Sequence, residues 1–171
     1  MRAMLAVLLP LCGCASMTID QFAGAKPEMR LEEYFNGHST AYGLFFDRTA
    51  DLRRQFKVEM NGKWDGTVLH LDEDFTYDDG EKQQRRWTFR KTSDTTWVGT
   101  APDVIGEAHG KMSGNAYEMH YTADVKRGAD SSIRLDFDDW LFRESDSVVM
   151  NNARATKFGL DVGQVQLVFV K

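Results

Sequence analysis

Two adjacent carboxylates followed by an indole, in the segment Asp138-Asp139-Trp140, are the side chains of this sequence best placed to do chemistry. They lie within residues 133–142, where apolar and polar side chains alternate with the period of two that is typical of a half-buried strand. If the alternation continues, Asp139 points to the apolar face; if a bulge forms at the two acids, Trp140 and Phe142 take that face instead. Both alternatives leave a carboxylate at or near the core, where burial is costly unless the acid is paired or hydrogen-bonded.

The two acids allow a functional and a structural interpretation. Neighbouring residues of a regular strand face opposite ways, so the pair does not form the facing acid and base of a glycosidase. One acid could instead be a polar anchor inside an apolar pocket, with the indole as its wall. The structural alternative, which we favour, is a salt bridge to Arg86 or Arg154. The candidate residues for a ligand pocket or a buried polar group are Asp138, Asp139, Trp140, Arg86, Trp87 and Asn115.

Other signals of catalysis or metal binding are weak. The histidines, at positions 38, 70, 109 and 120, lack the spacing of helical metal ligands, although His109 and His120 could face each other across a hairpin. The glycines of residues 106–111 lack the spacing of a phosphate-binding loop, and no Gly-x-Ser-x-Gly motif occurs. We therefore assign no catalytic residue, no metal and no cofactor, and we favour a protein that is not an enzyme.

The first fourteen residues differ in kind from the rest. Arg2 is followed by the apolar run Ala3–Leu11 and then by Leu11-Cys12-Gly13-Cys14, which is the order of a bacterial lipoprotein signal. We predict that residues 1–13 are a signal peptide and that Cys14 becomes the lipidated first residue, held by acyl chains that contribute about 0.8 kcal/mol per buried methylene. A plain secretory peptide and a Cys-x-Cys metal pair are the alternatives.

The predicted anchor also predicts a location and a domain plan. Ala15 and Ser16 follow Cys14, and the lack of an acid there favours the outer membrane, with the domain facing the periplasm. Residues 14–33 then form the lipidated cysteine and a tether, and residues 34–171 form a single barrel domain. Since both cysteines lie in the signal, the domain has no disulfide.

The composition of the chain fits one domain and argues against binding to nucleic acid. The 171 residues are 42% hydrophobic, which is enough for one sizeable core. The net charge of −5 comes from 21 basic and 26 acidic residues without a basic stripe, so we expect no nucleic-acid partner. No apolar run reaches the roughly 18–20 residues that span a bilayer as a helix.

Short alternating segments separated by turn residues must position the candidate residues. We predict strands at 41–48, 55–63, 66–77, 85–91, 95–101, 104–112, 116–126, 133–142, 148–157 and 164–170. Turns are expected at Asn61-Gly62, where a positive φ is needed, and at Asp78-Asp79-Gly80. Consecutive antiparallel strands form a meander, and closure removes its edges. The fold class is therefore all-β, an up-and-down barrel of lipocalin-like type, with an open β-sandwich as the alternative.

Charged residues at alternate strand positions define the expected outer face of this barrel. They are Lys57, Glu59, Arg85, Arg90, Lys126 and Arg134. A charged outer face argues against a barrel embedded in lipid. Most of the aromatic side chains must then form the core, although a barrel of this size can leave a cavity for a small ligand.

The order of several short motifs resembles a known family. The motifs are Gly43…Phe46-Asp47-Arg48, Gly62-Lys63-Trp64, Asp79-Gly80…Arg86-Trp87, Asp103-Val104-Ile105-Gly106-Glu107-Ala108…Gly110, Gly114-Asn115-Ala116, Asp138-Asp139-Trp140 and Lys157-Phe158-Gly159. From about Tyr34 to Lys171 the chain resembles the domain-of-unknown-function family 3833, a family of bacterial lipoproteins. The resemblance implies a lipocalin-like barrel behind a lipid anchor, in a family whose members often lie beside genes for modified fatty acids, such as cyclopropane synthases. It implies no activity and transfers no catalytic residue.

Three functions from different classes compete. The one that we favour is a binding module, anchored to the membrane by its lipid with its mouth near the bilayer, that binds or chaperones an acyl chain or another apolar small molecule. The second is a filled barrel that serves as an interaction module of the envelope. The third is an enzyme that acts on lipid through Asp138 or Asp139. The volume of a cavity separates the first two, and a carboxylate with a raised pKa inside that cavity would favour the third.

Overall fold

The computed structural model describes residues 17–126 and 131–171. The predicted signal peptide, residues 1–13, and the predicted lipidation site, Cys14, lie outside the described residues. Within the described ranges, no helix has both the length and the apolar character that crossing a membrane requires.

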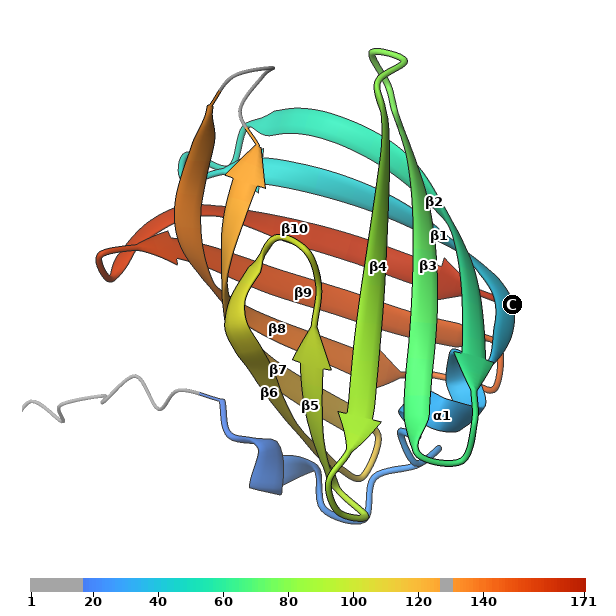
Figure 1. The fold of residues 1–171 in the computed structure, drawn as a ribbon. Coiled ribbons are helices and arrows are strands. Elements are labelled where there is room, and N and C mark those ends of the chain that lie inside the picture. The colour runs from blue at the N-terminus through green and yellow to red at the C-terminus, as the bar shows by residue number, and fades with distance from the viewer. Residues whose placement is uncertain (1–16, 127–130) are drawn as a thin grey trace, which may run out of the picture.

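Ten antiparallel strands in the described part of the chain close into one barrel (Figure 1). Each strand pairs with its neighbours in sequence, and β1 completes the circle by pairing with β10. This confirms the up-and-down barrel and rules out the open sandwich, which would leave two unpaired edges. The strands are β1 (Gly37–Asp47), β2 (Leu52–Trp64), β3 (Val68–Tyr77), β4 (Lys82–Lys91), β5 (Thr96–Thr100), β6 (Val104–Ser113), β7 (Ala116–Lys126), β8 (Ser132–Arg143), β9 (Val148–Lys157) and β10 (Leu160–Val170).

The alternation along β4 shows how a strand divides its side chains between the two faces of the barrel wall. Trp87 and Phe89 are buried inside the barrel, and Arg85 shares their face. Arg86 points outward, where its guanidinium pairs with Asp72. The expectation that Arg85 is an outer charge and Arg86 a pocket residue is therefore wrong, because residues of one parity share one face of a strand.

Strand β8 carries the two acids of the candidate segment without a bulge. Asp138 is opposite His120 of β7, and Asp139 is opposite Ala153 of β9, in an unbroken register. Asp139 therefore points into the barrel, which is the first of the two predicted alternatives, and Asp138 points outward. Trp140 also points outward, although it is only 4% exposed.

An N-terminal segment covers Trp140 on the outer face of the barrel. The 3-10 helix η1 (Ile19–Phe22) packs there, with the ring centroid of Phe22 6.0 Å from that of Trp140 and 5.3 Å from that of Phe142. The described part of the predicted tether, residues 17–33, thus lies against the barrel, because its apolar side chains cover those of β8.

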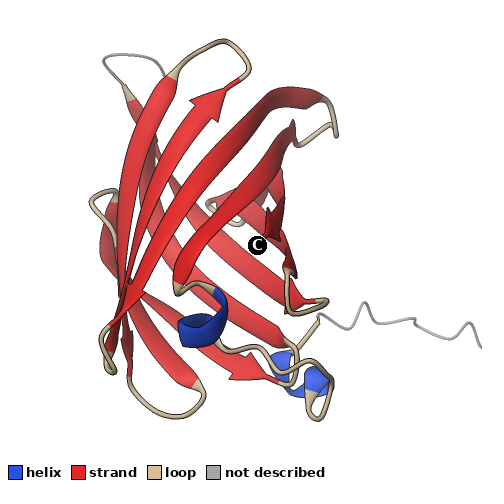
Figure 2. Cartoon of the chain, turned by 90° about the vertical axis from the view of Figure 1, so that its right-hand side faces the viewer, coloured by secondary structure: helices blue, strands red, loops and turns tan. Residues whose placement is uncertain are grey.

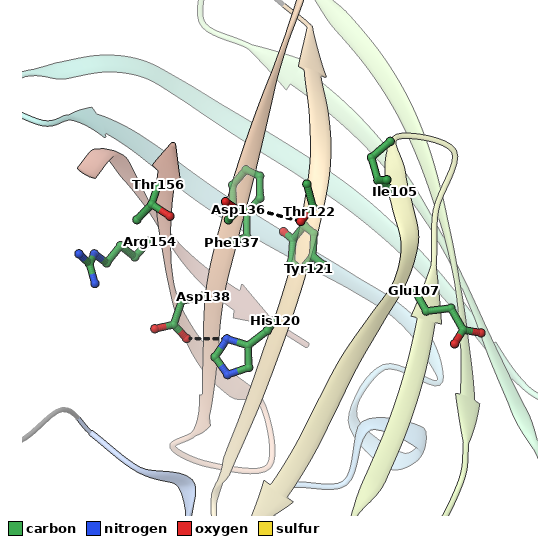
Figure 3. Close-up of a pocket in the computed structure, with 10 residues that line it drawn as sticks. All are labelled: Ile105, Glu107, His120, Tyr121, Thr122, Asp136, Phe137, Asp138, Arg154 and Thr156. Carbon is green, nitrogen blue, oxygen red and sulfur yellow. Dashed lines mark hydrogen bonds and ion pairs between the residues drawn. The ribbon is translucent and has the colours of Figure 1, made fainter. Parts of the chain in front are cut away.

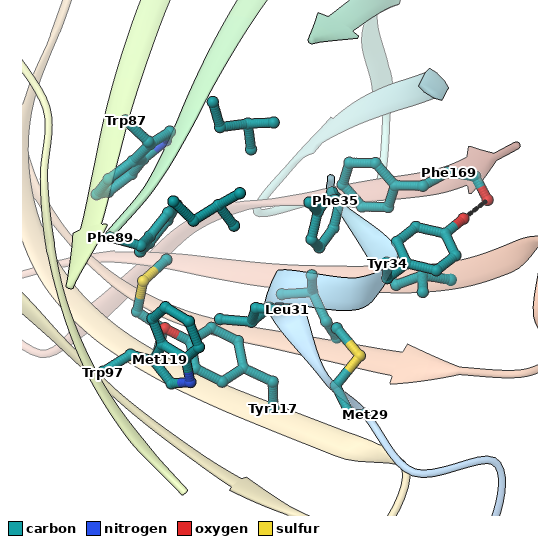
Figure 4. Close-up of a cluster of buried hydrophobic side chains, with 14 of the residues drawn as sticks. Met29, Leu31, Tyr34, Phe35, Trp87, Phe89, Trp97, Tyr117, Met119 and Phe169 are labelled. Carbon is teal, nitrogen blue, oxygen red and sulfur yellow. Dashed lines mark hydrogen bonds between the residues drawn. The ribbon is translucent and has the colours of Figure 1, made fainter. Parts of the chain in front are cut away.

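A single-turn helix closes one end of the barrel. The helix α1 (Leu31–Tyr34) lies at the end where β3 begins and β4 ends (Figures 1 and 2). The Tyr34 hydroxyl donates to the carbonyl oxygen of Phe169 at 2.9 Å. Leu31 and Phe35 turn toward the buried apolar cluster shown in Figure 4. This end is called the closed end, and the opposite end is called the mouth.

The predicted Asn61-Gly62 turn is wrong. Both residues lie inside β2, and the chain reverses beyond that strand near Gly66, which has a φ of 100°. Gly62 is needed for another reason, since a Cβ there would overlap the carbonyl oxygen of Phe35 just after α1. The glycine lets α1 approach the barrel wall closely.

Candidate functional site: an apolar cavity with a polar belt

The barrel is hollow. Its interior holds a cavity of about 660 Å³, within the range of pockets that bind small molecules. Leu31 and Phe35 line the closed end of this cavity, together with the buried apolar cluster of Figure 4. Phe45, Phe56 and Phe75 line it farther along the strands. A wall of this composition suits a molecule that is mostly hydrocarbon.

A belt of polar side chains crosses this apolar lining. The polar belt consists of Glu73, Arg85, Asp103, Tyr121, Asp139 and Asn151. The Nε of Arg85 donates to Oδ1 of Asp103 at 3.0 Å. The guanidinium of Arg85 also lies over the ring of Trp87, 4.4 Å from its centroid. Arg85 is therefore held by one carboxylate and one aromatic face.

Asp139 is the acid of the candidate segment that reaches the cavity. The Nδ2 of Asn151 donates to its Oδ1, and also to the carbonyl oxygen of Trp140 at 3.0 Å. Burial raises the pKa of Asp139 to about 6, although Asn151, Arg85 and Tyr121 oppose this rise. The carboxylate faces the cavity and is surrounded by protein, so neutral donors only partly replace its lost solvation.

Glu73, on β3, is a second buried acid of the belt. Its Oε2 is buried without a hydrogen-bond partner in the described residues. Burial raises the pKa of Glu73 to about 7; the charge of Arg85 opposes this rise, and the charges of Asp103 and Asp139 add to it. Carboxyl groups with pKa values of about 6 and 7 can exchange protons, or bind a charged group, near neutral pH.

The structure separates the six residues that were predicted to line a ligand pocket or to form a buried polar group. Two of them, Asp139 and Trp87, line the cavity. The other four do not: Asp138 and Arg86 point to the outer face, Trp140 is buried between that face and η1, and Asn115 lies in the turn between β6 and β7.

The salt bridge expected between the acids and an arginine takes a different form. Arg86 pairs with Asp72, and Arg154 pairs with Asp161, so neither compensates Asp139. A different arginine, Arg85, supplies the positive charge that acts on Asp139, and it does so through space.

Sequence reasoning missed Glu73 and placed Arg85 on the wrong face. Parity along the strands was the available signal. Glu73 has the parity of the apolar residues Leu71 and Phe75, and Arg85 has the parity of Trp87. A charged residue that has the same parity as the core residues of its strand is therefore a better candidate for a pocket residue than one that is merely adjacent to a tryptophan in the sequence.

A shallow hollow on the outer face lies around Asp138 (Figure 3). The Nδ1 of His120 is 3.4 Å from Oδ1 of Asp138, its Nε2 is 2.9 Å from Oε1 of Glu118, and the Trp140 indole donates to Asp138 at 2.9 Å. His109 is opposite His120 in the register, as predicted. Glu118, His120 and Asp138 could hold a metal ion, since one ligand atom of each lies within 4.8 Å of the others. Their mutual contacts also account for them as surface ion pairs.

Comparisons with known proteins add the family and the fold. The sequence profile of DUF3833, a family of proteins of unknown function, matches residues 8–171. Among curated proteins, none matches the sequence. Of the solved structures, the S-type phycobiliprotein lyase CPES from Guillardia theta is similar, with a TM-score of 0.60 and 11% identity over 84% of this chain and 93% of the lyase.

A redesigned β-barrel, mFAP1, bound to DFHBI, is a weaker match, with a TM-score of 0.44 and 9% identity over 84% of this chain and 100% of the designed one. At 11% identity the similarity to the lyase concerns the fold alone. The likeness to the lyase agrees with the closed, lipocalin-like barrel seen here.

Proposed function

This chain belongs to the DUF3833 family, whose function is unknown, and we propose that it is a binding protein for an elongated apolar ligand such as an acyl chain. The observation that carries the proposal is the cavity of about 660 Å³, closed at one end by α1 and lined largely by aliphatic and aromatic side chains. A hollow of this size speaks against the filled-barrel alternative, because protein interiors rarely leave voids larger than a water molecule.

Burial of a hydrocarbon chain would supply the binding free energy. Each methylene that leaves water contributes about 0.8 kcal/mol. About twelve buried methylenes would therefore contribute about 10 kcal/mol before the cost of ordering the ligand. Met60 and Met119 line the cavity, and their flexible side chains can adapt to the shape of such a chain.

A lipid anchor on Cys14 is the second part of the proposal, with the outer membrane as its location and the domain facing the periplasm. The support is the segment Leu11-Cys12-Gly13-Cys14 and the lack of an acid directly after it. The family match begins at residue 8 and so includes this segment. A lipid-anchored barrel of this kind would hold or carry acyl chains in the envelope, in connection with their chemical modification.

The test of ligand binding fills the cavity with a side chain. Ala153 is buried and faces the cavity, whereas Asn152 is exposed on the outer face. We expect Ala153→Phe to weaken the binding of a fluorescent apolar probe with a long alkyl chain by at least about tenfold, because the new ring occupies the space of the chain. Asn152→Phe should bind the probe as the wild type does. Titration of delipidated protein measures the affinity, and thermal melting shows that both variants fold.

Two results would reject the binding proposal. One is a wild-type protein that binds no fatty-acid, alcohol or amine chain and yields no lipid to solvent extraction and mass spectrometry. The other is a folded Ala153→Phe variant that binds the probe as tightly as Asn152→Phe does.

An enzyme that acts on lipid is a second candidate, which one observation favours. Asp139 lines the cavity, and burial raises its pKa to about 6. A carboxyl group of this kind could act as a general acid or base on a bound lipid. Conversion of an added lipid to a product of different mass, absent in Asp139→Asn, would support this activity. Recovery of every added lipid unchanged would reject it.

A further inference from the structure

The charges that line the cavity do not balance. The carboxylates among its described lining residues are Asp47, Glu73, Glu81, Asp103, Asp124 and Asp139. The cations are Arg54, Arg85 and Lys126. Outside the polar belt, the carboxylates have cationic partners: Asp47 with Arg53, Glu81 with Arg54, and Asp124 with Arg134. The imbalance therefore lies at the polar belt.

Within the belt, one cation serves three carboxylates. Arg85 is engaged by Asp103 at 3.0 Å. Its charge reaches Glu73 and Asp139 only through space, since the partners of Asp139 are the neutral side chains of Asn151 and Tyr121. Two carboxyl groups thus face the cavity without a cation of their own.

One oxygen of these carboxyl groups and one neighbouring hydroxyl are buried without a hydrogen-bond partner in the described residues. Oε2 of Glu73 accepts no hydrogen bond from any described residue. The hydroxyl of Tyr117 is likewise without a partner in the described residues, and it is close enough to Asp139 to respond to its charge. Buried polar atoms are nearly always hydrogen-bonded in a protein at rest, so unpartnered ones facing a cavity point to a ligand that completes them.

We infer that the ligand carries a primary ammonium group on an alkyl chain, and that this group binds between Glu73 and Asp139. The inference rests on the proposed binding function and names the class of ligand within it. An ammonium group has three N–H donors and one positive charge. It can therefore donate to unpartnered carboxylate oxygens of the belt while it supplies the missing cation. The alkyl chain lies along the apolar wall of the cavity.

The same belt disfavours a fatty acid that binds with its head group inside. A carboxylate at this depth would meet the like charges of Glu73 and Asp139 in a poorly solvated space. An alcohol of equal chain length offers one donor without charge and should be intermediate. The belt therefore predicts an order of affinity, with the alkylamine tightest, the alcohol next and the carboxylate weakest.

The experiment compares three ligands of one chain length, namely dodecylamine, dodecanol and dodecanoate, at pH 7.5 on delipidated wild-type protein. Displacement of a fluorescent apolar probe gives the three dissociation constants. We expect dodecylamine to bind at least about tenfold more tightly than dodecanol, which is the scale of one charge-assisted hydrogen bond. Dodecanoate should bind more weakly than dodecanol.

Isosteric variants then locate the ammonium group. Glu73→Gln and Asp139→Asn should each weaken dodecylamine by at least about tenfold and leave dodecanol within twofold of wild type. Asp74→Asn and Asp138→Asn are the matched controls, because these acids are the outward-facing neighbours in sequence. Both controls should bind all three ligands as the wild type does. If one belt variant does not fold, the other and the wild-type order still decide.

The outcomes separate this inference from the proposed function. If none of the three ligands displaces the probe from wild type, the binding proposal fails and the inference fails with it. If all three bind with equal affinity, or dodecanoate binds tightest, the barrel binds chains but the ammonium inference is wrong. The inference is also wrong if the folded belt variants bind dodecylamine as tightly as their outward controls.

Discussion

Arg85 and Arg86 are adjacent in sequence and lie on opposite faces of the barrel wall. The side chain of Arg85 is 17% exposed and acts on the three carboxylates of the belt. The side chain of Arg86 is 68% exposed and pairs with Asp72 in solvent. Water solvates Arg86 and Asp72 well even when they are not paired, so their ion pair should add little to stability. Arg85 is the cation whose loss should lower stability.

Replacement of the two arginines tests this difference at the level of the residue. Arg85→Met should lower the free energy of unfolding by about 3–5 kcal/mol, because it removes the cation of a buried ion pair and leaves the belt carboxylates uncompensated. Arg86→Met should change it by less than about 1 kcal/mol. Urea denaturation followed by tryptophan fluorescence at pH 7.5 measures both values. Equal losses in the two variants would contradict the inward position of Arg85.

Glu73 predicts how stability depends on pH. Its pKa is about 7 in the folded protein, against an ordinary value of 4.5, so the folded state binds more protons than the unfolded state between these values. The free energy of unfolding must then fall as pH rises. The stabilisation from this group is complete below about 4.5 and is lost as pH rises through about 7. Asp139, with a pKa of about 6, acts in the same direction.

Melting temperatures between pH 5 and 8 measure this dependence. The wild type should melt at a lower temperature at pH 8 than at pH 5.5, and Glu73→Gln should flatten the slope because it carries no proton to lose. Asp74→Asn, a change at the outward neighbour, should keep the wild-type slope. Parallel slopes for wild type and Glu73→Gln would show that Glu73 titrates as an ordinary surface acid.

The contact between α1 and β2 decides, at the level of the element, how the closed end is sealed. Gly62→Ala should destabilise the protein by about 1–3 kcal/mol, the usual cost of overpacking, because a Cβ there overlaps the carbonyl oxygen of Phe35. Asn61→Ala, at the exposed neighbouring position, should be close to neutral. Thermal melting of both variants checks the prediction. A neutral Gly62→Ala would mean that α1 does not lie against β2 at this point.

At the level of the whole molecule, the N-terminal segment bears on how the barrel would be oriented relative to a membrane. Both η1 and α1 lie at the closed end of the barrel (Figures 1 and 2). Met17, the first described residue, is three residues after Cys14, a distance of at most about 11 Å in extended chain. If Cys14 carries lipid, we expect the closed end, where η1 lies, to be nearer the bilayer than the mouth is. This differs from the expectation of a mouth near the anchoring membrane, and both orientations stay predictions.

Fluorescent labels at the two ends test this direction in proteoliposomes of the lipidated protein. Asp146, in the turn after β8, is 96% exposed at the closed end, and Phe158, in the turn after β9, is 90% exposed at the mouth. A label on Asp146→Cys should be quenched by brominated lipid, and a label on Phe158→Cys should not. Cys14→Ser should abolish both membrane binding and quenching. Stronger quenching at Phe158 would show that the mouth faces the membrane.

The local pattern of the sequence determined the strands of this protein and their order. The period of two in ten segments predicts the strands, and short turns between them predict an up-and-down order, because both properties belong to neighbouring residues. The same parity gave the first of two alternatives for β8, in which Asp139 shares the inner face with Leu141; the unbroken register decided between them. Applied to β3 and β4, it would also have found Glu73 and Arg85, so the polar belt was accessible from the sequence even though its partners were not.

Only the tertiary structure decided what those inward side chains do. The hollow interior, the single cation that serves three carboxylates, the closure by α1 and the cover over Trp140 all depend on residues far apart in the chain. Gly62 is required by the carbonyl of Phe35, and Trp140 is buried by Phe22, and no periodicity in either segment contains that information. Alternation says which face a side chain takes; the closed barrel determines what it meets there, because pairing across strands brings distant segments into one interior.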